Sequence, residues 1–138
     1  MRVFLDTNVL ASAIATRGIC ADVLQATLAE HELVVGEKVL SELHRVLMRK
    51  FRATTELADE TDEFLRREAE VIGAAPRLEI SVRDKDDITI LEQAVAGAAD
   101  VLVTGDRDLL ELESEVPLQI LNPRGFWDLL RETKPDDE

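Results

Sequence analysis

The chain has 138 residues, a length that one hydrophobic core of ordinary size fills, so we expect one domain. Hydrophobic residues make up 46% of it and aromatic residues only 4%, which predicts a core of aliphatic side chains. The net charge of −13 repels phosphate backbones, so a nucleic-acid substrate would need bound cations or a local basic patch. One cysteine, Cys20, excludes an intramolecular disulfide, and two histidines cannot make a zinc site alone.

The predicted elements alternate between strands and helices. In chain order we expect a strand at 2–5, a polar loop at 6–8, a helix at 20–29, a strand at 33–35, amphipathic helices at 38–51 and 55–72, a strand at 78–82, a helix at 88–96, a strand at 101–103, a short helix at 109–112, a strand at 118–121 and a helix at 123–130. This alternation predicts an α/β fold, a parallel sheet covered on both faces by helices.

Two further expectations concern the first and last residues of the chain. The apolar run before Asp6 is too short for a signal peptide or a membrane span, so we expect a cytoplasmic protein without membrane contact. We assign residues 1–132 to the domain and residues 133–138 to a frayed acidic tail.

Acidic residues follow the predicted strands at their carboxyl ends. Asp6 and Asp106 each come directly after a buried strand, and in open α/β sheets ligands bind beyond that edge. Glu42 and Asp87 lie at the starts of helices that follow strands, so their backbones belong near the same edge. We therefore expect four carboxylates to converge there.

Converging carboxylates repel one another, which raises their pKa values until a divalent cation neutralises them. Oxygen-only ligands select Mg²⁺ or Mn²⁺. A site of this kind supports phosphodiester hydrolysis without a side-chain nucleophile, because metal ions activate a water and stabilise the leaving oxygen.

Each acid also has a simpler explanation. Asp6 could cap the following helix, Glu42 could form a surface pair with Arg45, and the acids at 84, 86 and 87 could be a solvated loop cluster or helix cap. Asp106 lacks a capping box that would explain it. The argument for a site therefore depends on the set of acids.

Four segments resemble the PIN domain family, in that family's order, across residues 2–130. They are Val3-Phe4-Leu5-Asp6-Thr7-Asn8, Leu40-Ser41-Glu42-Leu43, Arg83-Asp84-Lys85-Asp86-Asp87 and Val103-Thr104-Gly105-Asp106-Arg107-Asp108-Leu109-Leu110. The chain is most similar to PIN-family toxins of toxin–antitoxin pairs, of the VapC-like kind. This resemblance implies a three-layer α/β/α fold with strand order 3-2-1-4-5, which places the strands of Asp6 and Asp106 side by side.

The resemblance also implies the site. Asp6, Glu42, Asp87 and Asp106 match the family's metal-binding, catalytic acids, with Asn8 and Thr104 as polar supports. Family members cleave RNA with Mg²⁺ or Mn²⁺, and the toxins among them dimerise and are silenced by an antitoxin. The interval from Asp87 to Ala94 fits the family pattern, with Asp86 as the alternative third acid; Asp108 is a second-metal ligand or, as an exposed first-turn residue, a helix cap.

Charge is segregated along the two amphipathic helices. Residues 44–52 hold four basic residues and no acid, whereas residues 53–72 hold seven acids and two arginines. At about 100° per residue, Lys38, Glu42, Arg45 and Arg49 share one helix face. This basic stripe either guides an RNA backbone toward the metal or pairs with the acidic second helix.

Two other classes of protein remain as alternatives. A haloacid-dehalogenase phosphatase also begins with a strand-end Asp, but it needs a second Asp two residues later, where this chain has Asn8. A non-catalytic interaction protein could keep the same fold. The four acids favour the ribonuclease over both alternatives.

Overall fold

The computed structural model describes residues 1–80 and 85–133, which form one five-stranded sheet in the order β3-β2-β1-β4-β5. All four neighbouring strand pairs are parallel. The strands are β1 (Arg2–Leu5), β2 (Glu32–Gly36), β3 (Glu70–Ile72), β4 (Val101–Val103) and β5 (Gln119–Leu121). The predicted α/β class, parallel pairing and strand order are therefore confirmed.

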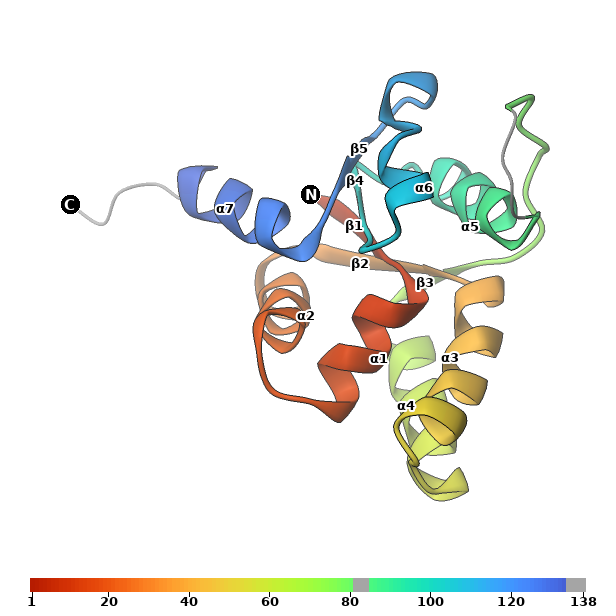
Figure 1. The fold of residues 1–138 in the computed structure, drawn as a ribbon, viewed down its shortest axis with the longest axis vertical. Coiled ribbons are helices and arrows are strands. Elements are labelled where there is room, and N and C mark those ends of the chain that lie inside the picture. The colour runs from red at the N-terminus through yellow and green to blue at the C-terminus, as the bar shows by residue number, and fades with distance from the viewer. Residues whose placement is uncertain (81–84, 134–138) are drawn as a thin grey trace.

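Helices cover both faces of this sheet, as predicted. They are α1 (Thr7–Ala15), α2 (Ile19–Glu30), α3 (Glu37–Lys50), α4 (Thr55–Glu68), α5 (Lys85–Ala96), α6 (Arg107–Leu110) and α7 (Pro123–Thr133), with a 3₁₀ turn at Glu113–Glu115. Figure 1 shows α1 to α4 below the strands and α5 and α6 above them, while α7 packs beside α2. The chain moves from β1 through β2 to β3 in one direction across the sheet and then returns to β4 on the other side of β1. Because crossovers between parallel strands are right-handed, this reversal places the later helices on the opposite face of the sheet, which gives three layers.

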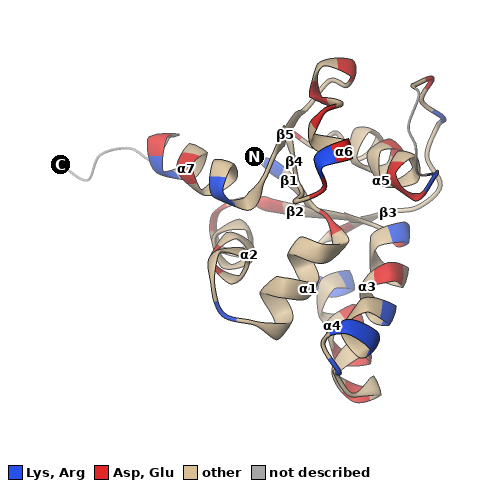
Figure 2. Ribbon diagram, in the orientation of Figure 1, with Lys and Arg blue, Asp and Glu red and all other residues tan. Residues whose placement is uncertain are grey.

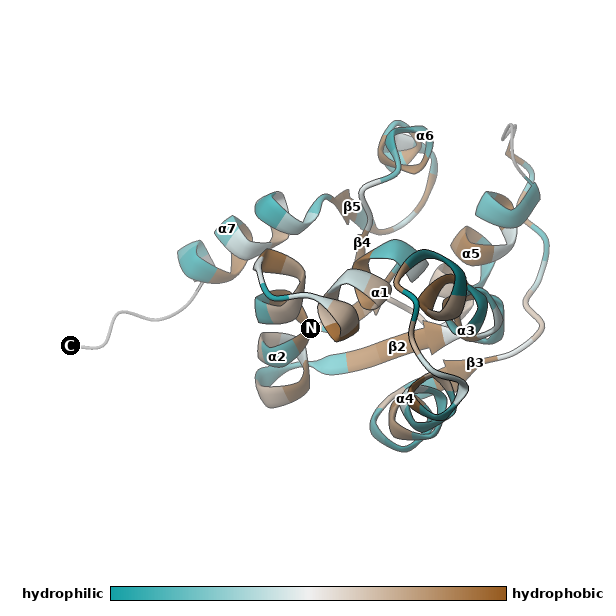
Figure 3. Ribbon diagram, turned by 60° about the horizontal axis from the view of Figure 1, so that its bottom comes forward, coloured by the Kyte–Doolittle hydropathy of each residue, from teal (hydrophilic) through white to brown (hydrophobic). Residues whose placement is uncertain are grey.

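The core lies between the layers and is aliphatic, as the composition predicts. Phe4 and Phe126 are its only fully buried aromatic side chains within the part of the chain that is described, and Leu, Val, Ile and Ala fill the rest. Figure 3 shows β2 in brown beyond its teal first residue, and helices in which brown and teal segments alternate. Burial of both sheet faces explains why β1, β2 and β4 are apolar along their length after the charged first residues Arg2 and Glu32, rather than alternating.

The polar triplet after β1 is not a loop, contrary to the sequence-based expectation. Helix α1 begins at Thr7, directly after Asp6, and runs to Ala15. Its sequence is apolar on almost every side because it packs between α2 and α3. A helix without a charged face lacks the period that identifies an amphipathic helix.

The third strand was also wrongly placed. Helix α4 ends at Glu68, rather than continuing to residue 72, and the strand is Glu70–Ile72. Residues 78–80, predicted to begin the strand, have no strand pairing, and 81–82 lie outside the described residues. Ile72 follows the buried Leu65 by seven residues, so it fits the helical period, and only pairing with β2 shows that it is in a strand.

The remaining predictions differ from the structure by a few residues at most. The tail beyond residue 133, predicted to fray, lies outside the described part of the chain. Within residues 1–80 and 85–133 no single helix is long and apolar enough to cross a membrane. Helices α1 and α2 together are long and apolar enough, but the pair is bent by 99°, and both helices bury apolar side chains inside the fold.

Candidate active site

Two chain segments meet at the carboxyl edge of the sheet, where β1 and β4 end side by side. Leu5 and Val103 are partners in the parallel register, and the backbone N–H of Asp6 donates to the carbonyl of Val103 at 3.0 Å. The next residue on each strand, Asp6 and Thr104, therefore projects from the same place. This arrangement confirms the expected neighbourhood of the two strand ends.

Asp6 is held by hydrogen bonds at both carboxylate oxygens. Its Oδ1 accepts from the backbone N–H of Thr7 and its Oδ2 accepts from Thr104 Oγ1, both at 2.7 Å. The first bond makes Asp6 the N-cap of α1, so the capping interpretation is correct alongside any other role. Burial to 6% exposure raises the pKa of Asp6, the two hydrogen bonds oppose that rise, and Asp106 adds repulsion.

Asp106 is connected to Asp6 through the same threonine. Its backbone N–H donates to Thr104 Oγ1 at 3.0 Å, so this buried hydroxyl accepts from one acidic residue and donates to the other. Asp106 Oδ1 accepts from the N–H of Asp108 at 2.9 Å and so caps α6. The cap on this short helix is Asp106, not Asp108.

The side chains of Asp87, Asp106 and Asp108 lie close together, and this aspartate group suits a metal ion. One oxygen from each side chain lies within 4.8 Å of the other two. Asp87 is buried, Asp106 is half-buried and Asp108 is exposed, so the group faces solvent on one side. These hard oxygen donors fit Mg²⁺ or Mn²⁺. Asp87 is in the first turn of α5, Asp106 is the N-cap of α6 and Asp108 is in its first turn, and Figure 2 shows acidic residues at the starts of both helices.

Glu42 reaches this edge from α3 through Thr7. The hydroxyl of Thr7 donates to Glu42 Oε1 at 2.9 Å, and Lys38 Nζ lies 3.7 Å from Glu42 Oε2. The Glu42 side chain is 14% exposed. Among the described residues it pairs with Lys38 rather than with Arg45, so the predicted surface pair is not formed.

The geometry separates the two candidates for the third acid. Asp86 forms an ion pair with Lys38 Nζ at 2.8 Å, and its side chain is 57% exposed. Asp87 is 8% exposed and joins Asp106. These placements favour Asp87, although both lie in the first turn of α5; residues 83 and 84 of the same motif lie outside the described chain.

The other predicted site residues are placed as follows. Asn8 is exposed in the first turn of α1. Arg45 and Arg49 are exposed on α3, and no ion pair to either is found within residues 1–80 and 85–133. Across the α3–α4 contact Arg66 instead forms an ion pair with Glu37, and His44 Nε2 forms a hydrogen bond with Asp59. The basic stripe is therefore not neutralised by α4.

Sequence reasoning missed the role of Thr7. It sits between Asp6 and Glu42, donating its backbone N–H to the first and its hydroxyl to the second. Its only signal in the sequence is its place next to a strand-end acid. The second bond joins residues 35 positions apart, so no local pattern could reveal it.

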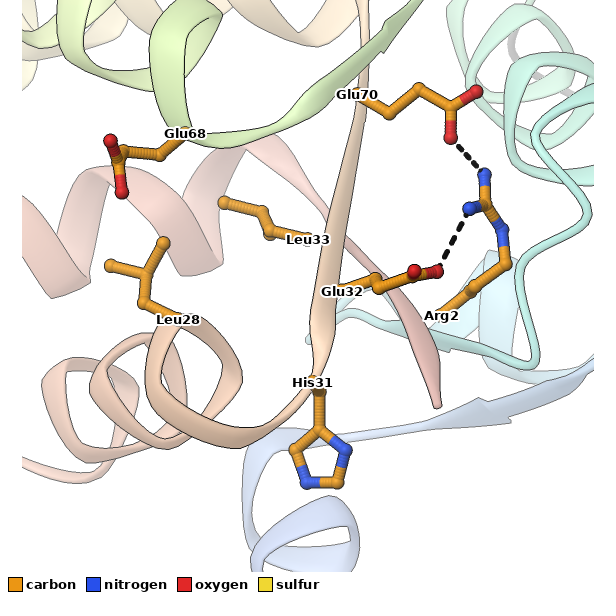
Figure 4. A pocket seen from close by; sticks show the side chains of 7 residues that line it. All are labelled: Arg2, Leu28, His31, Glu32, Leu33, Glu68 and Glu70. Carbon is orange, nitrogen blue, oxygen red and sulfur yellow. Dashed lines mark hydrogen bonds and ion pairs between the residues drawn. The ribbon is translucent and has the colours of Figure 1, made fainter.

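The opposite edge of the sheet is built differently. An open pocket there is lined by Arg2, Leu28, His31, Glu32, Leu33, Glu68 and Glu70, shown in Figure 4. The guanidinium of Arg2 pairs with Glu32 and Glu70 and also donates to the carbonyl of Gly97. Arg2 thus ties three segments together at the amino ends of the strands, away from the aspartate group.

Comparison with known proteins agrees with these features. The family model described as PIN domain matches residues 2–108, which include all four predicted acids. No curated protein sequence matches the chain.

Solved structures with low sequence identity share the fold. They include VapBC2 from Rickettsia felis bound to a DNA fragment from its promoter (19% identity, TM-score 0.60, 88% of this chain and 98% of that one). VapBC-1 from nontypeable Haemophilus influenzae gives 20% identity and a TM-score of 0.62 over 90% and 99% of the two chains. PAE2754 from Pyrobaculum aerophilum gives 17% and 0.63 over 96% and 91%. Because the family model spans most of the chain, and because the strand order and the strand-end acids agree with it, the chain belongs to the PIN domain family.

Proposed function

We propose that this protein is a metal-dependent endoribonuclease that hydrolyses RNA phosphodiester bonds. The observation that carries the proposal is the group formed by Asp87, Asp106 and Asp108, whose oxygens lie within 4.8 Å of one another. Thr104 connects this group to the buried Asp6, and membership of the PIN domain family supports a nuclease.

The metal ligands proposed are Asp6, Glu42, Asp87 and Asp106, with Mg²⁺ or Mn²⁺ as the ion and Asp108 as an additional donor. When bound, the ion supplies charge neutralisation at the scissile phosphate and activation of a water. The chain itself fixes the acids. Thr104 orients the Asp6 carboxylate, Thr7 orients Glu42, and Lys38 offsets part of the negative charge of Glu42 and Asp86.

RNA reaches the acids along α3 in this proposal. Arg45 and Arg49 are exposed, and they lie on the helix face that also carries Lys38 and Glu42. Lys38 itself is engaged by two carboxylates, so the two arginines are the stronger candidates for contacts to the RNA backbone. Such local cations counter the net charge of −13.

A toxin of a toxin–antitoxin pair is the proposed cellular role. The support is the similarity in fold to VapBC structures from two bacteria. We propose a cognate antitoxin as the protein partner and a homodimer as the assembly. Co-expression with the product of a small neighbouring gene tests the first, because an antitoxin co-purifies and restores growth. Light scattering tests the second, because a mass near 15.4 kDa contradicts a dimer.

The nuclease is tested with single-stranded and structured RNA in Mn²⁺ or in EDTA, beside a phosphomonoester substrate. We expect internal cleavage of RNA that requires the metal, with a loss of at least about 100-fold in Asp106→Asn. Asp22→Asn removes one charge from the exposed start of α2 and is the matched control. Cleavage that persists in EDTA, or equal rates in the two variants, contradicts the proposal; turnover of the phosphomonoester alone favours a phosphatase.

A further inference from the structure

The side chain of Gln93 on α5 connects this helix to the start of α3 and to the residue after β3. Its side-chain Oε1 accepts a hydrogen bond from the backbone N–H of Lys38 at 3.2 Å, and its Nε2 donates to the carbonyl of Gly73 at 3.0 Å. The residue is 5% exposed. A buried carboxamide with both ends bonded holds its partners firmly, because breaking either bond leaves a polar group without water.

The contact is built into the start of α3. The N-cap of this helix is Gly36, which has no side chain to accept from the first N–H groups, so the carboxamide of Gln93 serves in its place. A Cβ at Gly36 would lie 1.9 Å from Gln93 Oε1. An alanine at this position would therefore displace the Gln93 carboxamide from the start of α3.

The hydrogen bond between Gln93 and Lys38 also affects the positions of two proposed metal ligands, Glu42 and Asp87. Lys38, whose N–H is capped, lies one helical turn before Glu42 on α3, and its Nζ bonds Asp86 beside Asp87 on α5. Gln93 itself is on α5, fewer than two turns after Asp87. A shift of α3 against α5 would therefore change the separation of Glu42 from Asp87.

We infer that Gln93 is a positioning residue, which fixes α3 against α5 so that Glu42 and Asp87 serve the same metal site. This inference rests on the proposed nuclease function. The hydrogen bonds of the Gln93 side chain go to the backbones of Lys38 and of Gly73, which follows β3, so its effect on the acids passes through these two segments.

The experiment compares Gln93→Met with Thr27→Val. Methionine keeps the length of the side chain and removes both hydrogen bonds. Thr27 is a matched control because it is also buried, and its hydroxyl donates to the carbonyl of Val23 within α2, a helix that carries none of the proposed metal ligands. For each variant, three quantities are measured: the free energy of unfolding, the Kd for Mn²⁺ by calorimetry without RNA, and kcat and KM for RNA.

We expect both variants to lose stability, but only Gln93→Met to bind Mn²⁺ about tenfold more weakly and to lose kcat with little change in KM. A Kd for Mn²⁺ within twofold of the Thr27→Val value overturns the inference. If Gln93→Met does not fold, Gly36→Ala replaces it, because a Cβ at the end of β2 displaces the Gln93 carboxamide. The Kd for Mn²⁺ of Gly36→Ala is then compared with that of Thr27→Val. A wild-type protein that binds Mn²⁺ yet leaves RNA intact contradicts the proposed function, while the comparison of Mn²⁺ affinities still decides the role of Gln93.

Discussion

Thr104 donates its hydroxyl to Asp6 Oδ2 at 2.7 Å across the junction of β1 and β4, although 98 residues separate the two in sequence. The hydroxyl oxygen of Thr104 in turn accepts a hydrogen bond from the backbone N–H of Asp106. One buried hydroxyl thus orders the two acids that follow neighbouring strands. Parallel pairing of β1 with β4 is what brings it to them.

Replacement of this hydroxyl tests its importance. Thr104→Val keeps the shape of the side chain but leaves Asp6 Oδ2 without its hydroxyl donor and the N–H of Asp106 without an acceptor. We expect the free energy of unfolding to fall by about 1–3 kcal/mol and the RNA cleavage rate to fall about tenfold or more. Thr104→Ser retains the hydroxyl and is the control. Equal cleavage rates in the two variants would show that the hydroxyl does not organise the site.

Asp6 gives a prediction for the pH dependence of stability in metal-free protein. Burial is the largest cause of its raised pKa, so the folded state binds a proton more readily than the unfolded one. The ionised carboxylate therefore costs stability, and the cost grows as pH rises above 3.8, the ordinary value of the group. Asp6→Asn, which keeps a good helix cap, should therefore have a higher free energy of unfolding than the wild type at pH 7.

That gain should disappear below pH 3.8, where Asp6 is protonated in both states. Urea unfolding at several pH values in EDTA measures it, with Asp22→Asn on the exposed start of α2 as the control. A gain that does not change with pH would contradict burial as the cause. More stable protein with less activity is the usual result of removing a charge from an active site.

Arg2 is predicted to matter for stability and not for catalysis. Its guanidinium donates to the carbonyl of Gly97 through two nitrogens, at 2.9 and 2.7 Å, and pairs with Glu32 and Glu70. Arg2→Met leaves that partly buried carbonyl without a donor, so we expect a loss of about 1–3 kcal/mol in the free energy of unfolding. The exposed ion pairs add little.

The rate of RNA cleavage per folded molecule should stay within twofold of wild type in Arg2→Met. Arg67→Met removes an exposed arginine whose only described ion pair spans 3.8 Å, and it should leave stability nearly unchanged. If fully folded Arg2→Met cleaved RNA much more slowly than wild type, the active site would have to lie at the amino ends of the strands, not at the carboxyl ends as proposed.

The arginines of α3 give a prediction about substrate binding. Replacing Arg45 and Arg49 together by Gln should raise KM for RNA with little change in kcat and should weaken the dependence of KM on salt, because fewer counterions are released on binding. Arg17→Gln with Arg67→Gln, which removes two exposed arginines elsewhere, is the control of equal charge. An equal rise in KM for both pairs would mean that net charge alone governs binding.

Much of the fold could be predicted because most of the buried strands are short apolar runs that the sequence shows directly. Val101–Val103 and Arg2–Leu5 have the predicted bounds, since short apolar runs beside polar residues leave few alternatives. β3 could not be found in this way. Its three residues continue the helical pattern of α4, and the free energy that makes them a strand comes from pairing with β2, which is a tertiary contact.

The candidate site divides along the same line. Asp6 and Asp106 were predictable because a strand end fixes where the next residue lies. The choice of Asp87 over Asp86 came from the interval to Ala94 in the family resemblance, and the burial of Asp87 beside the exposed Asp86 favours the same choice. The bonds of Thr7 to Glu42 and of Gln93 to Lys38 join residues far apart in the chain. Such partners have no local pattern, because nothing in the spacing of either residue depends on the other.

The two outermost strands of the sheet, β3 and β5, have three residues each and carry one exposed residue apiece at their starts, Glu70 and Gln119. So short an edge offers few unpaired backbone groups to another chain, and a charged or polar side chain at its head disfavours an approaching strand. Edge-to-edge aggregation is therefore discouraged. A second copy gains little by extending the sheet, and the proposed homodimer is expected to join through helical surfaces.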